Sequence, residues 1–188
     1  MSFVSGSILT ARATLSGGPL NVSTANVTFP AAGTMIFNQD STSSGAATTG
    51  IVVNGDYPAL TGNLTIQIGA GTSANATGPV TLNGAISDGG AGFSLNKTSP
   101  NGSSLGTLIL NGTNNYSGNT TVSAGGFTIG GSGSLGVTPS ATNYSGNIIL
   151  TAATSALTNA TSATQLWSGQ ISGAGKLTQN GPGTAARS

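Results

Sequence analysis

The hydrophobic residues of this 188-residue chain fall in short alternating runs rather than in helical stripes. In each run the apolar side chains take roughly every second position, which is the period of a β-strand with one buried face. No segment sustains the i, i+3, i+4, i+7 spacing of an amphipathic helix. The runs are NVTF, TMIF, IVV, NLTIQI, PVTL, FSL, TLIL, TTVSA, FTI, NIIL and KLTQ. The pattern predicts an all-β protein of many short strands.

Turn-forming residues bound these runs, because Gly, Asn, Ser or Pro stands directly beside each one, in most cases on both sides. Strands this short and this closely spaced are typical of a β-sandwich, a β-barrel or a stacked β-solenoid. The pattern of strands and turns alone leaves these three architectures open.

Internal repeats favour the solenoid. The phrase NYSGN occurs at residues 115–119 and again at 143–147. A longer segment from Leu82 to Thr98 parallels the segment from Leu166 to Asn180, which puts Gly84 and Gly169 at the same place in the two repeats. We therefore expect a single solenoid domain over residues 1–188, with its clearest repeats at 82–126 and 166–184.

These repeats resemble the autotransporter-associated β-strand repeat, which occurs in passenger domains of bacterial autotransporters and in related large secreted surface proteins. The residues that carry the resemblance are GTLILNGTNNYSGNTTVSAGG in the first repeat and GQISGAGKLTQNGPGT in the second. The match runs over Leu82–Gly126 and again over Leu166–Thr184, which together are about a third of the chain. The resemblance implies a right-handed parallel β-helix exposed at the bacterial cell surface.

In such a solenoid, alternate residues of each strand would stack into apolar columns. We expect Leu108, Leu110, Val122 and Ile129 to point inward, and the Thr and Ser residues between them to meet water. At roughly 20–25 residues per coil, the chain would form about eight coils. The alternative fold is a pilin-like β-sandwich in which the segment 1–20 is a donated strand, and it would require mainly antiparallel pairing.

Charge is nearly absent, with four Lys and Arg, three Asp, no Glu and a net charge of +1. Nucleic-acid binding is therefore excluded, because it needs clustered basic residues. No apolar run approaches the length of a membrane-spanning helix, so we expect no membrane insertion, and the first residues lack the pattern of a signal peptide. A nearly neutral surface favours association between copies of the chain.

Candidate chemistry is sparse. The absence of His and Cys excludes a Ser-His-Asp triad and thiolate chemistry. Asp40, Asp56 and Asp88 all stand in turn-like contexts, where Asp commonly caps backbone groups. The neighbours Asp56 and Tyr57 form the one pair that could be considered as a site. The sequence therefore predicts no enzyme, no catalytic residue, no cofactor and no metal site.

Aromatic and Asn residues offer two weaker candidates for binding or modification. Trp167, Tyr116 and Tyr144 could form a sugar-binding platform, but packing over the edge of a coil is the favoured interpretation. The Asn-x-Ser/Thr pattern occurs eleven times. Asn turns before Thr-rich strands explain most of it, although glycans remain a hypothesis. The candidate glycan acceptors are Asn111, Asn115 and Asn119.

The two ends of the chain look complementary. The second repeat is followed after Thr184 by AARS instead of an alternating strand, while ATLSGG near the N-terminus is close to the missing phrase. A solenoid without caps exposes unpaired strand edges that can pair with another chain. We expect residues 1–30 of one molecule to contact the last coil of the next, head to tail. The candidate contact residues are Ile8, Leu9, Leu15, Leu20, Leu177 and Thr184.

Three functions are compatible with these observations. The first is a non-catalytic extracellular structural protein, a subunit of a self-assembling surface filament whose partner is another copy of itself. The second is an autotransporter passenger segment that acts as an adhesin, with host-cell or matrix carbohydrate as a further candidate partner. The third is a carbohydrate-active β-helix enzyme, which would depend on Asp56 or Asp88.

Overall fold

The computed structural model describes residues 2–13, 19–41, 50–70, 78–99, 106–136 and 143–187, and the side chains of all these except 8–13, 39–41 and 70. In this part of the chain every regular element is a β-strand. The all-β prediction is therefore confirmed.

The described strands are short, and most have two to five residues. In chain order they are β1 (Ser7–Ala13), β2 (Leu20–Ser23), β3 (Gly33–Ser41), β4 (Ile51–Asn54), β5 (Leu64–Ala70), β6 (Val80–Leu82), β7 (Leu95–Thr98), β8 (Leu108–Leu110), β9 (Thr113–Asn114), β10 (Thr120–Val122), β11 (Gly125–Ile129), β12 (Ser134–Leu135), β13 (Asn143–Tyr144), β14 (Ile148–Leu150), β15 (Ser155–Asn159), β16 (Gln165–Trp167), β17 (Ile171–Gly173), β18 (Lys176–Gln179) and β19 (Ala185–Arg187).

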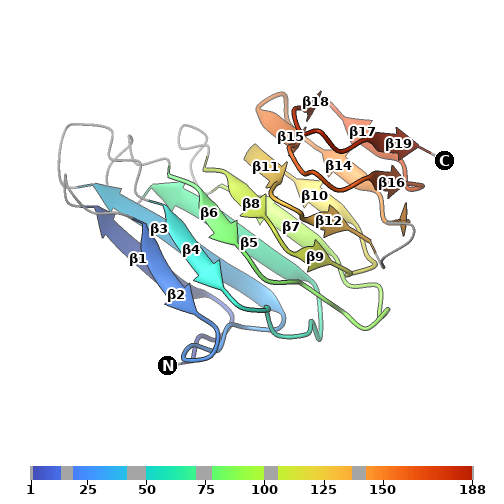
Figure 1. The fold of residues 1–188 in the computed structure, drawn as a ribbon. Helices are drawn as coiled ribbons and strands as arrows, with labels where there is room; N and C mark the ends of the chain where they lie inside the picture. Colours follow the sequence, from blue (N-terminus) through green and yellow to red (C-terminus); the bar gives the residue numbers. More distant parts are fainter. Residues whose placement is uncertain are drawn as a thin grey trace.

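The strands form stacked coils of a parallel β-helix (Figure 1). One seven-stranded sheet has the order β1-β3-β5-β7-β10-β14-β17, and a second has the order β2-β4-β6-β8-β11-β15-β18. The third side carries two smaller sheets, β9-β12 and β13-β16-β19. Every described ladder is parallel. The sandwich alternative is therefore wrong, because it requires mainly antiparallel pairs.

The described residues make seven coils, since each large sheet has seven strands, rather than the eight expected from the repeat length. The difference arises because several coils are longer than the repeat period suggests. Leu64 pairs with Leu95, which is 31 positions further along the chain, whereas Leu108 pairs with Phe127, only 19 positions away. Connections between the two large sheets account for much of the extra length: residues 42–50 separate β3 from β4, but only residues 123–124 separate β10 from β11.

The core lies between the sheets as columns of inward side chains. Leu108, Leu110, Val122 and Ile129 are fully buried, which confirms their predicted orientation. One column runs through all seven strands of the second sheet, and we call it the leucine column. Its members, in order along the stack, are Leu20, Ile51, Val80, Leu108, Phe127, Leu157 and Leu177.

Glycines occupy corners where one coil passes close to the next. A Cβ atom at Gly84 would collide with the carbonyl of Gly55, and one at Gly112 would collide with that of Gly84. Gly169 lies in a different column, because a Cβ atom there would collide with Gly146. Gly84 and Gly169 are therefore not at equivalent places in the solenoid.

The strands of the two long repeats also differ in position. β7 of the first repeat lies in the first large sheet, while β18 of the second repeat lies in the second large sheet. The shared phrase is a local turn-and-strand pattern, and a parallel solenoid can use such a pattern on more than one of its sides. The shorter repeat is in register: β10, after the first NYSGN, pairs directly with β14, after the second.

Candidate functional site

The carboxylates considered for catalysis are engaged in holding corners of the solenoid. Asp88 is buried, and its side chain accepts hydrogen bonds from the backbone N–H groups of Gly90, Gly92, Phe93 and Ser117, and from the Ser117 hydroxyl, at 2.8–3.0 Å. Burial alone would raise the pKa of Asp88, but the hydrogen bonds from Ser117, Gly90 and Phe93 outweigh it and hold the pKa below its usual value. Asp88 therefore remains an anion that ties its own turn to the next coil.

Asp56 lies at a corner of the solenoid, whereas Asp40 lies within a strand. Asp56 is exposed at a corner, and its Oδ1 accepts a 2.8 Å hydrogen bond from the backbone N–H of Ala85 in the next coil. Its neighbour Tyr57 points into the core and is 5% exposed, so the two side chains do not form a pair. Asp40 lies within β3, as the register partner of Arg12 in β1, so its interpretation as a turn residue is wrong.

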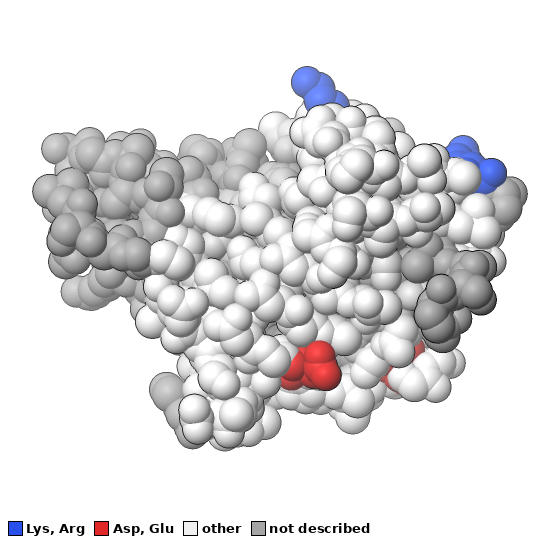
Figure 2. Space-filling view, viewed as in Figure 1, with Lys and Arg blue, Asp and Glu red and all other residues white. Residues whose placement is uncertain are grey.

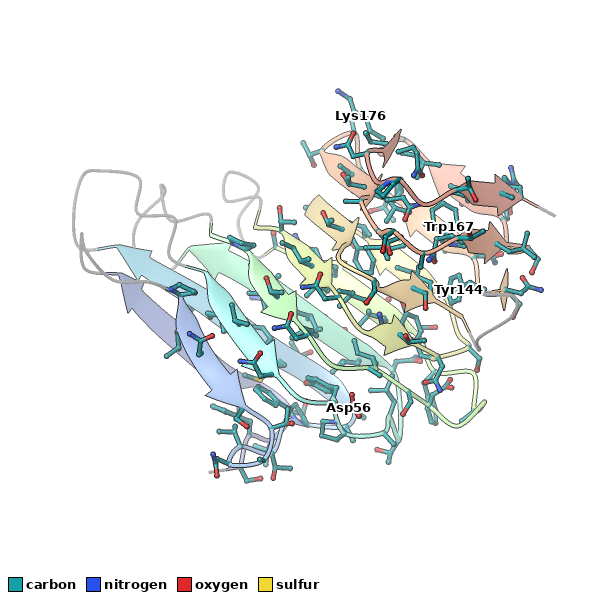
Figure 3. The ribbon with its side chains drawn as sticks, viewed as in Figure 1. Asp56, Tyr144, Trp167 and Lys176 are labelled. Carbon is teal, nitrogen blue, oxygen red and sulfur yellow. The ribbon has the colours of Figure 1, made fainter. Side chains whose placement is uncertain are left out.

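The aromatic residues proposed as a sugar platform lie inside the solenoid. Tyr116, Tyr144 and Trp167 are at most 1% exposed. Tyr116 and Tyr144 meet edge to face with ring centroids 5.7 Å apart. Tyr144 is the register partner of Trp167, and both residues are labelled in Figure 3. The Thr120 hydroxyl joins the two phenols by hydrogen bonds of 2.6 and 2.7 Å. Their packing role agrees with the favoured interpretation, because rings at these positions cannot stack on an external sugar.

Burial raises the pKa of the three described tyrosines above its ordinary value. Desolvation is the main cause for Tyr57, Tyr116 and Tyr144, and the Asp88 charge adds to it for Tyr144. These phenols therefore stay neutral and act as hydrogen-bonding or packing groups rather than as acids or bases.

Lys97 is a buried cation that the sequence analysis did not single out. It replaces a hydrophobic residue in an inward column of the first sheet, between Ile66 and Val122. Its ammonium group donates to the Ala124 carbonyl at 2.6 Å and to the Ser99 hydroxyl at 3.2 Å. Burial lowers the pKa of Lys97 to about 8. The alternation from Leu95 was the available signal, because a strand that buries Leu95 also buries Lys97.

Asparagine residues form a second structural feature that the sequence analysis missed. Asn54 is the last residue of β4, and Asn83 and Asn111 directly follow β6 and β8, so the three lie at the ends of successive strands of the second sheet, each just before a glycine. Asn83 Nδ2 donates to Asn54 Oδ1, and Asn111 Nδ2 donates to Asn83 Oδ1, both at 2.8 Å. We call these three residues the asparagine ladder. Its signal in the sequence was the recurrence of Asn-Gly, first after 29 positions and then after 28.

The candidate glycan acceptors lie at or beside corners. Asn111 belongs to the asparagine ladder, and Asn119 accepts from the backbone N–H of Asn147 at 2.9 Å. Asn115 has a buried Oδ1 without a hydrogen-bond partner among the described residues. Glycosylation of these residues stays a prediction.

The two end coils carry the candidate assembly residues. Leu20 in β2 is 36% exposed and Leu177 in β18 is 49% exposed, although the five members of the leucine column between them are fully buried. Thr184 is exposed and its hydroxyl lies 3.4 Å from that of Thr164. Ile8 and Leu9 lie in β1, but their side chains are outside the described set, and Leu15 is outside the described residues.

Charge is sparse on the molecular surface. On the face drawn in Figure 2 the described positive and negative groups lie at separate places, and the other described residues on that face are uncharged. Lys176 lies at the end of the stack formed by the last coil, far from Asp56 (Figure 3).

Among the described residues, no three His, Cys, Asp or Glu side chains come together as a metal site would require. The same part of the chain contains no helix of the length and apolarity needed to cross a membrane.

Comparison with known proteins gives one distant relative. The chain is 36% identical, over 64% of its length, to a protein named as the adhesin BmaC autotransporter of Brucella suis biovar 1 (strain 1330). The matched part spans 4% of that much longer protein. No known family matches the chain. No solved structure matches it either. Part of the chain is thus a distant homologue of a small segment of an autotransporter adhesin.

Proposed function

We propose that this chain is a non-enzymatic segment of a rod at the bacterial cell surface, in a passenger of the autotransporter adhesin type. The similarity to a segment of an adhesin autotransporter is the observation that carries this proposal. The parallel β-helix supports it, because a stack of coils extends in one direction and holds its outer surface away from its point of attachment.

The way in which successive coils are joined also suits a rod. Each coil pairs its backbone with the next and continues the same columns, so the fold can lengthen without a new core. The buried carboxylate of Asp88 and the exposed carboxylate of Asp56 both bond to the backbone of a following segment. These roles favour a structural protein over the carbohydrate-active enzyme, for which the described residues offer no pair of free carboxylates.

Adhesion to host-cell or matrix carbohydrate is the finer part of the proposal. The outward positions of the second sheet form a row of small polar and β-branched side chains. In order along the stack they are Asn21, Val52, Thr81, Ile109, Thr128, Thr158 and Thr178. Hydroxyl groups can exchange hydrogen bonds with sugars, and the surface has little charge to repel either acidic or basic glycans.

The proposal can be tested by fusing the chain to an unrelated autotransporter translocator and displaying it on bacteria. We expect the chain to be accessible to protease on intact cells and to increase attachment to epithelial cells or matrix-coated wells over the translocator alone. A matched control is Gly146→Val, which places a side chain against Gly118 and Tyr144 and should disrupt the coil. Display of the folded chain without any gain in attachment would contradict the adhesive role and leave a spacer role.

A subunit of a self-assembling extracellular filament is the second candidate. It is favoured by one observation, the nearly neutral charge of the chain, because copies with a net charge of +1 repel one another little. Electron microscopy of the purified protein, with and without residues 1–20, tests it. Fibres that disappear on truncation would support the filament, and single short rods in both samples would contradict it.

A further inference from the structure

The asparagine ladder presents hydrogen-bonding groups to solvent that its own bonds do not use. Asn54 and Asn83 are exposed, and Asn111 is half-buried. Asn83 uses one N–H to reach Asn54 and one lone pair of its Oδ1 to accept from Asn111. A side-chain amide has a second N–H and a second lone pair, and no described residue takes either of these from Asn83. The ladder bonds hold the amides in place and so fix the direction of the groups that remain.

A row of small and polar residues lies beside the ladder. A glycine follows each ladder residue, and the next positions are Asp56 (Figure 3), Ala85 and Thr113. Asp56 and Thr113 are exposed, and the Ala85 side chain points outward because its neighbour Ile86 is fully buried. The Ala85 N–H donates to Asp56 Oδ1, whereas no described residue donates to Asp56 Oδ2. We call the three ladder residues together with Asp56, Ala85 and Thr113 the polar strip.

The charges of the described side chains restrict what the polar strip can bind. Asp56 is the charged residue of the strip, and the nearby surface supplies no described cation: Lys97 is fully buried, and Lys176 and Arg187 belong to the last coil. An anionic glycan would therefore meet a carboxylate without a compensating positive charge. An apolar partner would bury the remaining amide groups without hydrogen bonds, which costs free energy. A neutral ligand rich in hydroxyl groups avoids both costs.

We propose that the polar strip binds a neutral linear glycan. A hydroxyl group both donates and accepts, so the sugar hydroxyls match the donor and the acceptor that Asn83 keeps, and Asp56 Oδ2 accepts a further hydrogen bond. The ordered amides lose little freedom on binding. Coils are about 4.8 Å apart, so the three amides span about 10 Å and contact successive sugars of one chain. This inference rests on the carbohydrate part of the proposed function and assigns the contact to one place on the solenoid.

The site can be tested with a printed array of linear glycans in neutral, sialylated and sulfated series of increasing length. The purified chain should bind the neutral series, and longer chains should bind more tightly because each sugar adds only polar contacts. Added salt should change this binding little, since no ion pair forms.

Two variants and a control locate the contact. Asn83→Ala removes the central amide and should lower the affinity for the neutral glycans about fivefold. Ala85→Ile leaves the ladder bonds intact and covers the strip with a larger side chain, so it should lower the affinity by a similar factor. The control Asn96→Ala makes the same change as Asn83→Ala at an outward position of the first sheet, between Thr65 and Thr121, and should leave the affinity unchanged.

Circular dichroism of each variant checks that it is folded at the temperature of the assay. Binding to the sialylated or sulfated series in preference to the neutral one, or binding that falls steeply with salt, would overturn the proposal. Absence of binding to every neutral glycan would also overturn it, as would affinities of Asn83→Ala and Ala85→Ile equal to that of the control.

Failure of this site can be told from failure of the adhesive role by comparing the array with the display experiment. Increased attachment of displaying bacteria that neither strip variant reduces would overturn the site and leave the adhesive role standing. Strip-dependent binding to neutral glycans on the array without increased attachment would support the site and contradict adhesion to host cells or matrix.

Discussion

Lys97 shows how a single residue can set the pH dependence of this fold. Its ammonium group is buried in an apolar column, where its partners among the described residues are the Ala124 carbonyl and the Ser99 hydroxyl. Burial penalises the charged form, which is why its pKa falls to about 8. The unfolded chain holds the proton up to about pH 10.4. The penalty is therefore complete below about pH 8 and disappears as the pH rises towards 10.

Replacing Lys97 with Met should stabilise the protein at neutral pH. Met fills similar space without a charge, and the gain is about 1–3 kcal/mol after the lost hydrogen bonds are counted. Urea unfolding at pH 7, 8.5 and 10 measures it. The advantage of Lys97→Met over the wild type should shrink across this series, and a difference that does not change with pH would contradict the buried-charge explanation.

Asp88 has the opposite pH dependence. Its hydrogen bonds hold the pKa below the unfolded value, so its contribution is present at neutral pH and is lost as the pH falls through the acidic range. Asp88→Asn should lower the free energy of unfolding by roughly 2–3 kcal/mol, because an amide cannot accept all five bonds. The difference from wild type should narrow below about pH 4. Asp56→Asn, which affects one exposed bond, is the control and should have a much smaller effect.

At the scale of the element, the asparagine ladder links three successive corners of the second sheet. Asn83 is its central member, because it both donates and accepts, whereas Asn54 and Asn111 each share a single ladder bond with it. Asn83→Ala should therefore cost roughly 1–2 kcal/mol, about twice the cost of Asn54→Ala or Asn111→Ala. Urea unfolding of the three variants measures the free energy of unfolding that each one loses. Equal losses would mean that the side chains contribute separately, without a ladder.

The elements themselves were largely predictable from the sequence, since strand period and turn residues are local properties. The inward orientation of Leu108 and Ile129 followed from alternation alone. The number of coils did not follow, because the connections such as residues 42–50 carry no strand pattern that reveals their length. The equivalence of Gly84 and Gly169 failed for a related reason: a local phrase does not say on which side of the solenoid it lies.

The candidate site was less predictable than the fold, because it depends on contacts between coils. Asp56 and Asp88 could be assigned to turns from their neighbours in sequence. The five hydrogen bonds of Asp88 include two from Ser117, which lies 29 positions further along the chain and in another coil. The exposure of Leu20 and Leu177 likewise depends on their places at the ends of one column, which only the register of the sheet reveals.

At the scale of the whole molecule, stability should vary along the stack. A parallel solenoid behaves as a row of coils, each supported by its neighbours, so in this chain studied on its own the first and last described coils have support on one side only. The strands β17, β18 and β19 are mostly exposed, whereas β10 and β11 alternate between buried and half-buried positions. Local opening should therefore begin at the ends and reach the middle coils last.

Hydrogen exchange measured by mass spectrometry tests this gradient. In the isolated chain we expect peptides covering β2 and β18 to exchange at least about tenfold faster than peptides covering β8 and β11. The reason is that β8 and β11 each pair with a strand on both sides, whereas β2 and β18 each pair with a strand on one side. Equal exchange rates along the stack would contradict the gradient and would indicate that the coils open together.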